Sequence, residues 1–499
     1  MKYRSTRGSG KIEDVIDFES AVLNGLAPEG GLYIPTDIPQ LDEVALDKLR
    51  KISGDFGLLA VEILSLYIDE SEISREELKE LVNRSYSTFQ HPDVTPVIQL
   101  PAVKSDPEGS SNPLYLLELF HGPTFAFKDL AANEPRHRLT VVGATSGDTG
   151  GAAIYGLRNK EDVEVFILHP EGKVSPIQEA QMTMVMDPNV HNVSLPGHFD
   201  DCQNIVKKLF GNEEFRNKFQ LGAVNSINWA RILAQTVYYF KAYFSLESKI
   251  GKCQKVIFSV PTGNFGDILA GHYARQMGLP IERLIIATNQ NDILHRVFTA
   301  GAYSKDAEQG VQPTHSPAMD ILVSSNFERL LWYLANTGDV PQACATLTKW
   351  MSEFASTGQV QLPEAALIQL RKWFLSYTIN DAKTVEIIRD FYTATPSPYL
   401  LDPHTAVGVG AALELKAQLS PTPIVCLATA HPAKFQAAVQ LATQKSPDDR
   451  FDFDSIMGQG YLPEPFREWM NPNLPRRCHR LTSAEPQAVQ DLIASIVRQ

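Results

Sequence analysis

A lysine inside an apolar run is the residue whose position most strongly suggests chemistry. Lys128 lies in the segment HGPTFAFKD (121–129), among Phe, Pro and Ala residues and without a basic neighbour. Burial there would disfavour the charged ammonium, lower the pKa of the lysine and leave a nucleophilic amine. Such an amine can hold a carbonyl cofactor, for example pyridoxal phosphate, as a Schiff base. The alternative is a surface lysine lying over aromatic side chains.

Two glycine-rich loops are candidate anion sites, because each follows a strand and precedes a helix. The loop PTGNFGDIL (261–269) can turn several backbone N–H groups towards one point, and the next helix adds partial positive charge, which suits a phosphate. It has neither the ending of a P-loop nor the dinucleotide pattern G-x-G-x-x-G. The loop ATSGDTGGAA (144–153) has no lysine and suits a carboxylate better. A plain strand-to-helix turn remains open for both.

Three polar segments complete the set of candidate residues. NSINWARI (225–232) ends near Arg231, whose planar fork suits a second phosphate, although a surface arginine at a helix start is the alternative. In LATAHPAKF (427–435), Thr429 ends a strand and can donate a hydrogen bond to an unprotonated pyridine nitrogen, or simply cap the next helix. In LDPHTAVG (401–408), Asp402 is expected as a helix N-cap and His404 as a helix-start residue.

The elements that must position these residues alternate between strand and helix. The strands TVVGA (140–144), VIFSV (256–260) and PIVCLAT (423–429) are each followed by a loop and a helical pattern. This order predicts an α/β fold with parallel or mixed sheets flanked by helices, whose ligands gather at the carboxyl ends of the strands. The expected domains are a helical N-terminal cap, a catalytic α/β region with a helical insertion outside the sheet, and a C-terminal segment: 1–95, 96–440 (insertion about 326–395) and 441–499.

Composition excludes several classes of function. The net charge of -13 argues against nucleic acid or an anionic membrane as a partner. The five cysteines are dispersed, as expected for reduced thiols and not for a disulfide framework or a zinc site, and no metal is predicted. No secretory or mitochondrial pattern is expected at the N-terminus, and no window is long enough to span a membrane. We therefore expect a cytoplasmic enzyme.

Taken together, these segments resemble the fold-type II pyridoxal-phosphate (PLP) enzymes, the tryptophan synthase β family, and within them the long-chain threonine synthases of fungi and bacteria. The resemblance covers nearly the whole chain and includes, in order, YRSTR, GLAPEGGLYIP, HGPTFAFKD, VGATSGDTG, VSPIQ, VNSINWARI, PTGNFGDILAG, SSNFERLLW, LDPHTAVG and TAHPAKF. So many long matches in one order are far more specific than any single glycine-rich loop.

The resemblance assigns a role to each matched residue. Lys128 matches the lysine that carries PLP and acts as the proton-transfer base, and Thr429 matches the residue that faces the pyridine nitrogen. The remaining matches are a phosphate loop for PLP, a substrate-carboxylate loop and a substrate-phosphate site: Gly263, Asn264, Phe265, Gly266 and Asp267; Ser146, Gly147, Asp148 and Thr149; and Asn225, Ser226 and Arg231. The implied reaction converts O-phospho-L-homoserine and water to L-threonine and phosphate, by a monomer.

One stretch departs from the family pattern. Family members have a long helix between the lysine motif and the strand before SGDTG, whereas only the 11 residues 129–139, with Pro135 among them, separate Lys128 from Thr140 here. A crossover with its helix needs about 10–12 residues or more, so this link is at the lower limit. The shortened link leaves a catalytically impaired relative open as an alternative. A second alternative, independent of this link, is a phospho-lyase that releases 2-oxobutyrate from the same substrate, because it would share every motif named here.

Overall fold

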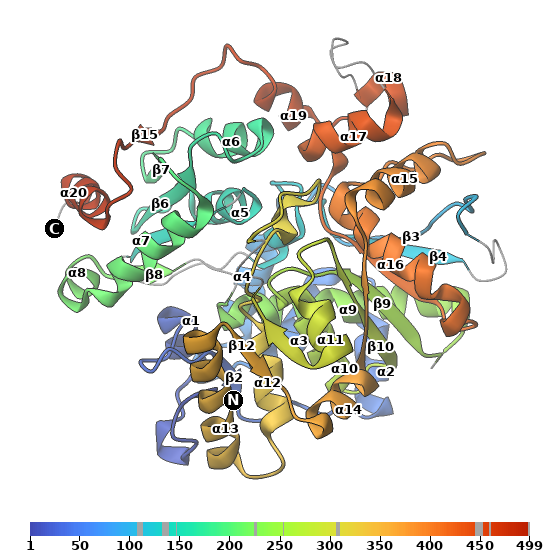
Figure 1. The fold of residues 1–499 in the computed structure, drawn as a ribbon, viewed down its shortest axis with the longest axis horizontal. Coiled ribbons are helices and arrows are strands. Elements are labelled where there is room, and N and C mark those ends of the chain that lie inside the picture. Colours follow the sequence, from blue (N-terminus) through green and yellow to red (C-terminus); the bar gives the residue numbers. More distant parts are fainter. Residues whose placement is uncertain are drawn as a thin grey trace. The chain divides into compact units, whose positions relative to one another are not determined.

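The computed structural model describes most of the chain and divides it into two compact units. Unit 1 comprises Met1–Ala131 and Ser226–Phe451, and unit 2 comprises Ala132–Asn225 and Asp452–Gln499 (Figure 1). The structure describes residues 1–106, 113–131, 139–145, 147–223, 227–252, 254–305, 310–444, 453–458 and 461–497. Most of the shortened crossover, 132–138, lies outside this range, so the prediction made for it stays a prediction.

Unit 1 is built on a six-stranded sheet in which every strand except the last is parallel to its neighbours. From edge to edge, the strands are β13 (Phe374–Thr378), β10 (Ile281–Thr288), β9 (Val256–Pro261), β14 (Ile424–Ala428), β4 (Leu114–Glu118) and the antiparallel β3 (Val97–Gln99). The central strands β9 and β14 are buried along their whole length, which explains their continuous apolar sequences VIFSVP and IVCLA. The predicted parallel arrangement is confirmed.

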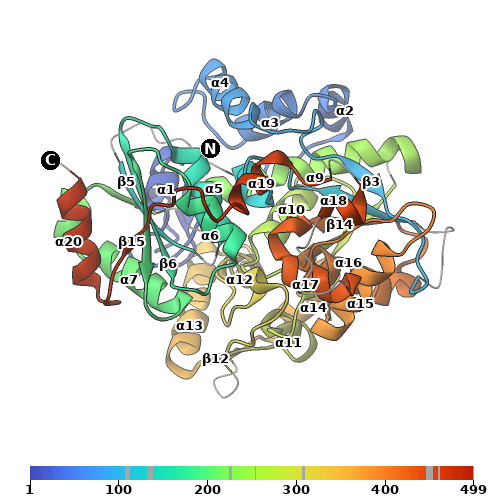
Figure 2. The same ribbon diagram turned by 90° about the horizontal axis from the view of Figure 1, so that it is seen from above.

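The other elements of unit 1 are mostly helices, some on the sheet and some packed on other helices. These helices are α1 (Phe18–Asn24), α2 (Glu43–Ile52), α3 (Phe56–Ser65), α4 (Arg75–Tyr86), α9 (Trp229–Ile250), α10 (Gly266–Gln276), α11 (Ile293–Ala300), α12 (Phe327–Ala335), α13 (Val340–Thr357), α14 (Glu364–Trp373), α15 (Asp381–Tyr392), α16 (Pro403–Leu419) and α17 (Gln436–Thr443). Two small antiparallel pairs, β1 (Tyr3–Ser5) with β2 (Tyr33–Pro35) and β11 (Ala302–Ser304) with β12 (Gln359–Gln361), complete the unit. Figure 2 shows α2, α3 and α4 in a row, where α3 also packs against α9.

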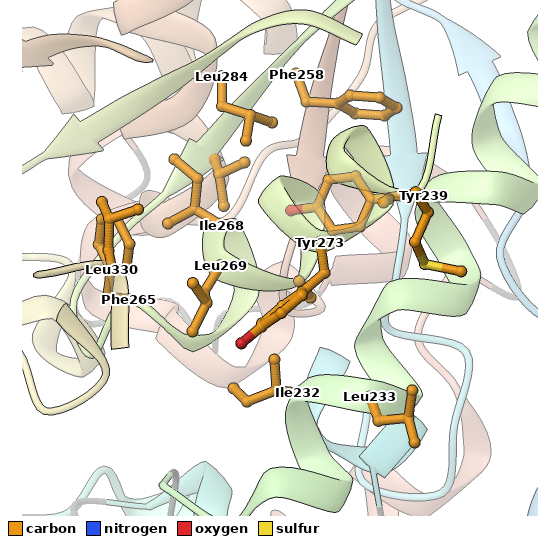
Figure 3. Close-up of a cluster of buried hydrophobic side chains, with 14 of the residues drawn as sticks. Ile232, Leu233, Tyr239, Phe258, Phe265, Ile268, Leu269, Tyr273, Leu284 and Leu330 are labelled. Carbon is orange, nitrogen blue, oxygen red and sulfur yellow. The ribbon is translucent and has the colours of Figure 1, made fainter. Parts of the chain in front are cut away.

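The core of unit 1 lies where α9 and α10 cover the sheet. Figure 3 shows Ile232 and Leu233 of α9, Ile268, Leu269 and Tyr273 of α10, and Phe258 and Leu284 of the strands β9 and β10, all buried. Each such side chain contributes about 1.5–3 kcal/mol when it is fully buried. This packing fixes the start of α10 relative to the end of β9, which is where the glycine-rich loop lies.

Local sequence signals set several helix ends as predicted. At the start of α4, Ser74 and Glu77 form a reciprocal capping box, in which the Ser74 N–H donates to the Glu77 carboxylate at 2.9 Å. Asp402 caps α16, and Pro403 is its first residue. Both predictions are confirmed.

One part of the expected helical insertion joins the sheet instead. Helices α12 to α15 lie in this region, but α14 ends at Trp373 and the segment FLSYT forms β13, parallel to β10. The interpretation of 326–395 as wholly outside the sheet is therefore wrong. Phe374 is buried and its ring lies 5.9 Å from that of Phe265, so burial overrides the helical pattern of the preceding residues.

Unit 2 has a five-stranded parallel sheet with helices on both faces. The strand order is β15 (His479–Arg480), β7 (Val190–Leu195), β6 (Val163–Pro170), β5 (Leu139–Ala144) and β8 (Leu221–Ala223). One face packs against α7 (Phe199–Gly211) and α20 (Pro486–Ile496), and the other against α5 (Asp148–Leu157) and α6 (Pro176–Thr183). The short helices α8 (Glu213–Lys218), α18 (Phe453–Met457) and α19 (Glu464–Trp469) complete it.

Candidate active site

The candidate site in unit 1 is built at the carboxyl ends of its parallel strands. Strands β9, β14 and β4 run in the same direction, so the segments that follow them leave from the same edge of the sheet. The glycine-rich loop follows β9, the Thr429 loop follows β14, and the lysine segment follows β4. The sheet therefore brings together three segments that are far apart in the sequence.

The loop after β9 presents backbone N–H groups that have no acceptor in the described part of the chain. These are the N–H groups of Gly263, Asn264, Phe265 and Gly266, which come just before and at the start of α10. Phe265 adopts a left-handed backbone conformation (φ 64°), which turns the chain sharply into the helix. Orphan donors at a helix N-terminus bind an anion without needing a basic side chain.

The opposite side of this loop is held by neighbouring polar groups. The Ser324 hydroxyl donates to the Gly263 carbonyl (2.8 Å), and both the backbone N–H and the side-chain amide of Asn326 donate to the Asn264 carbonyl (3.0 and 3.1 Å). These two carbonyls therefore have partners within the described part of the chain, whereas the N–H groups of the loop have none there. The sequence suggested the loop but not these partners, although the quoted motif SSNFERLLW contains them.

The two glycines of this loop leave little room for a larger residue. A Cβ atom at Gly263 would lie 3.2 Å from the Ala318 carbonyl oxygen and 3.3 Å from the Cα of Met319. A Cβ atom at Gly266 would lie 3.2 Å from the side chain of Ile232. Backbone on one side and a packed helix on the other therefore set the shape of the cradle.

The side chain of Asp267 points towards α9. One of its carboxylate oxygens accepts hydrogen bonds from the hydroxyls of Tyr238 (2.5 Å) and Tyr239 (2.8 Å). Burial raises the pKa of Asp267 to about 6, and the two tyrosines act in the opposite direction. Among the predicted loop residues, Asp267 therefore anchors the start of α10 to α9 through its side chain.

The lysine segment pairs with the loop after β14. The N–H of Phe127 donates to the Thr429 carbonyl (2.9 Å), the N–H of His431 donates to the Phe125 carbonyl (3.1 Å), and Ala126 and Ala430 form an antiparallel bridge. Lys128 lies in the 3-10 turn Phe127–Ala131 that follows. Residues 128 and 429 are thus held on adjacent, hydrogen-bonded segments.

Lys128 itself is only half-buried. Its Nζ atom lies 5.7 Å from the centre of the Phe127 ring, a cation–π distance. The complete desolvation that the apolar sequence suggested is therefore absent. The aromatic contact that was the alternative interpretation is present, and it is compatible with an amine that reaches a ligand.

Asp129 closes the lysine turn, a role that the sequence did not reveal. Its carboxylate accepts hydrogen bonds from the N–H (2.8 Å) and the hydroxyl (2.5 Å) of Thr124, while Lys434 donates to the Thr124 carbonyl (2.8 Å). Burial raises the pKa of Asp129 to about 6. A Cβ atom at Gly122 would lie 2.5 Å from the Asp129 side chain, so only glycine fits at that position of the motif.

Arg231 lies in the first turn of α9 and is 5% exposed. Its guanidinium forms no hydrogen bond or ion pair with any residue that the structure describes; its one electrostatic partner there is Asp129. Burial lowers the pKa of Arg231 to about 10, and the charge of Asp129 opposes that shift. A buried guanidinium without a hydrogen-bonded partner suits an anionic ligand. Asn225 and Ser226, predicted beside it, lie outside the described residues.

Thr429 is buried at the end of β14, and its backbone is held on both sides. Its N–H donates to the Thr405 hydroxyl (3.3 Å) and its carbonyl accepts from Phe127. Its own hydroxyl forms no hydrogen bond within the described ranges. The hydroxyl is thus available to a ligand, and its predicted role towards a pyridine nitrogen stays a prediction.

The carboxylate loop belongs to unit 2. Gly147 has φ 141°, which favours glycine, and α5 starts at Asp148. The Thr145 hydroxyl accepts from the N–H groups of Gly147 (2.9 Å) and Gly150 (2.8 Å), and the Asp148 carboxylate accepts from the Gln178 side chain (2.8 Å). Thr149 is half-buried, and Ser146 lies outside the described residues.

Two kinds of feature are absent from the described residues. They contain no group of three or more His, Cys, Asp or Glu side chains that could hold a metal ion. None of their helices is both long enough and apolar enough to cross a membrane.

Three family models match the chain. They are a pyridoxal-phosphate dependent enzyme model over residues 88–368, a threonine synthase N-terminus model over 2–86 and a threonine synthase C-terminal model over 405–493. A threonine synthase of Schizosaccharomyces pombe is 50% identical over 500 aligned residues, which cover 92% of this chain and 94% of the relative.

Two solved structures are similar over almost their whole length. The crystal structure of threonine synthase from yeast has 45% sequence identity to this chain and a TM-score of 0.89. The alignment covers 99% of this chain and 98% of the yeast chain. The PLP-bound threonine synthase from Brucella melitensis has 39% identity and a TM-score of 0.84, with full coverage of both chains.

Proposed function

This chain belongs to the threonine synthase family of PLP-dependent enzymes, and we propose that it converts O-phospho-L-homoserine and water to L-threonine and phosphate. The observation that carries the proposal is the set of unengaged N–H groups at Gly263–Gly266, on the same sheet edge as Lys128 and Thr429. These groups fit PLP: an anion cradle for its phosphate, an amine for its aldehyde and a neutral hydroxyl for its pyridine nitrogen. When bound, PLP supplies an electron sink for carbanions at the substrate.

The cofactor-binding residues act through neutral donors. Gly263, Asn264, Phe265 and Gly266, with the backbone of Asp267, would hold the cofactor phosphate by N–H donation and the positive end of α10. The carboxyl of Asp267 is directed to Tyr238 and Tyr239, which keeps its negative charge off this phosphate. Thr429 would donate its hydroxyl to the pyridine nitrogen.

Lys128 would move the protons. Its Nζ would take the proton from the substrate Cα, release it, and then take one from Cβ, which drives loss of the γ-phosphate. It would return protons to Cγ and, after water adds at Cβ, to Cα, while the proton that the water loses goes to the released phosphate. The half-buried position of Lys128 and its pairing with the Thr429 loop support this role, because the amine must swing between several substrate atoms.

Arg231 would hold the phosphate of the substrate. Its burial and its lack of a hydrogen-bond partner among described residues support this assignment. The negative neighbour Asp129 keeps the guanidinium charged and oriented before substrate binds. Asn225 and Ser226 would add neutral donors, and Ser146, Gly147, Asp148 and Thr149 would bind the substrate carboxylate at the start of α5.

Isotope labelling tests the proposed reaction directly. In ¹⁸O-labelled water, elimination followed by water addition places the label in the hydroxyl of threonine and none in the released phosphate. Label in phosphate would indicate simple ester hydrolysis, and 2-oxobutyrate in place of threonine would indicate the phospho-lyase.

Lys128→Ala is expected to abolish product formation. The control Lys372→Ala, an exposed residue of α14, should leave it unchanged. We infer a cytoplasmic monomer, which the solution mass and cell fractionation can test.

A further inference from the structure

The carboxylate of Asp402 accepts more hydrogen bonds than a helix cap requires. As the N-cap of α16 it accepts from the backbone N–H groups of His404 (3.0 Å) and Thr405 (3.4 Å). It also accepts from the side chains of both residues, from the Nδ1 of His404 at 2.9 Å and from the hydroxyl of Thr405. Asp402, His404 and Thr405 are at most 3% exposed. Capping accounts for the first two bonds and leaves the two side-chain bonds unexplained.

The first side-chain bond leads to the wall of the phosphate loop. The Nε2 of His404 accepts from the N–H of Ala318 (3.1 Å). Because Nε2 is the acceptor, the proton of the neutral ring is on Nδ1, where it is donated to Asp402. The Ala318 carbonyl and the Met319 Cα are the atoms that flank Gly263, at 3.2 and 3.3 Å from where its Cβ would be. His404 thus fixes the backbone that shapes the cradle.

The second side-chain bond leads to Thr429. The Thr405 hydroxyl donates its proton to Asp402, so its oxygen is left to accept the N–H of Thr429 (3.3 Å). This bond restrains the backbone of the residue proposed to face the pyridine ring. The same helix is tied to β9, because the Ser259 hydroxyl donates to the Gly408 carbonyl (2.6 Å). Both routes therefore start from one rigid element.

We propose that Asp402 is a positioning residue which, through His404 and Thr405, fixes the phosphate-binding loop and the Thr429 loop relative to one another, and so sets how the cofactor lies in its site. The proposal rests on the proposed function and its cofactor placement. It distinguishes two routes: the His404 route acts on the phosphate end of the cofactor, and the Thr405 route acts on the ring end. A helix cap alone would stabilise the fold and affect neither end.

Matched substitutions separate the routes. His404→Leu removes both side-chain bonds of that residue, whereas His404→Gln can keep an acceptor near the position of Nε2. Thr405→Val removes the hydroxyl and keeps the shape and the helix cap. The control is Asp339→Ala at α13, which removes an N-cap that accepts only a backbone N–H among the described residues, that of Gln342 at 3.0 Å. Asp339→Ala should lower the melting temperature without altering the bound cofactor.

The readouts are the ³¹P resonance of the bound cofactor phosphate, the dissociation constant of PLP from the reconstituted apoenzyme, and the visible absorption band. We expect His404→Leu to move the ³¹P resonance. It should also weaken PLP binding about tenfold, which corresponds to the loss of one hydrogen bond to the cofactor phosphate. His404→Gln should recover much of this affinity. Thr405→Val should shift the absorption band and leave the ³¹P resonance in place.

The outcomes are distinguishable from failure of the proposed function. Wild-type protein that carries no cofactor on Lys128 would refute the proposed function, and this inference with it. Wild-type protein that carries the cofactor, with unchanged ³¹P and absorption signals in His404→Leu and Thr405→Val, would overturn this inference alone. If His404→Leu does not fold, His404→Gln and Thr405→Val decide: a normal ³¹P resonance, PLP affinity and absorption band in both would overturn it.

Discussion

The N–H of Phe127 donates a hydrogen bond to the carbonyl of Thr429 at 2.9 Å, across 302 positions of the sequence. This bond joins the turn that carries Lys128 to the loop that follows β14. A backbone contact of this kind does not depend on side-chain identity. Substitution of Lys128 or Thr429 should therefore leave this contact in place. A change in activity on such a substitution therefore reports on the side chain that was removed.

Arg231→Lys is expected to lower kcat/KM for the phosphorylated substrate by roughly 10- to 150-fold. A hydrogen bond to a charged group contributes about 1.5–3 kcal/mol, and lysine lacks the planar fork. Steady-state kinetics and inhibition by inorganic phosphate measure the effect. The control Arg216→Lys, on the surface of unit 2 and 43% exposed, should change neither. Equal kinetics in the two variants would exclude Arg231 from the substrate-phosphate site.

Gly263→Ala is expected to weaken PLP binding by about tenfold, equivalent to one lost hydrogen bond. The added Cβ would lie 3.2 Å from the Ala318 carbonyl oxygen, so the loop or its wall must shift. Gly211→Ala is the matched control, because a methyl group added there would meet no atom within 4 Å. Gly211 is the last residue of α7, and alanine has a higher helix propensity than glycine. Titration of apoenzyme with PLP measures both variants, and unaltered affinity in Gly263→Ala would show that the cradle tolerates a methyl group.

The buried carboxyl of Asp267 is expected to reduce stability as the pH rises. Its folded pKa of about 6 lies above the usual value of 3.8, so the folded state binds the extra proton between these values. The free energy of unfolding contributed by this group is therefore highest below about pH 4 and falls as the pH rises to about 6, by up to about 3 kcal/mol.

Asp267→Asn tests that sign, because asparagine can still accept from Tyr238 and Tyr239 but does not ionise. Denaturant unfolding of the wild type and the variant at pH 4, 5 and 7 gives the difference. The variant should gain stability relative to the wild type as the pH rises through this window. A difference that is constant with pH would mean that Asp267 has an ordinary pKa.

The Lys416–Asp106 ion pair is expected to be costly to break from one side. The Lys416 side chain is fully buried and its Nζ lies 2.6–2.7 Å from the two Asp106 carboxylate oxygens, which are also buried. Lys416→Met should cost about 3–5 kcal/mol, since it leaves a buried charge, and the double variant with Asp106→Leu should recover most of that loss. Chemical unfolding measures each variant; additive losses in the double variant would contradict the pairing.

The structural features that could be predicted from the sequence are those determined by residues close together in the chain. The apolar run of β9, the following loop and the start of α10 could be placed, as could the Ser74 capping box, because each signal spans only a few positions. The fold class and the family followed from the order of long motifs. Such patterns are set by local propensity and hydrophobic periodicity.

Contacts between distant segments could not be predicted in this way. Nothing in the sequence indicates that Asp267 faces Tyr238, that Asn326 engages the Asn264 carbonyl, or that His404 accepts from Ala318. Each of these contacts depends on how elements pack in three dimensions. The segment of β13 was misjudged for the same reason, because its burial beside β10 decides its conformation.

The proposed chemistry requires that the cofactor is attached to Lys128, and borohydride reduction followed by peptide mass mapping identifies the attachment residue. We predict one pyridoxyl group, on the peptide that contains Lys128. A pyridoxyl group on another residue, such as the buried Lys434 that donates to the Thr124 carbonyl beside the lysine turn, or no modification at all, would contradict it.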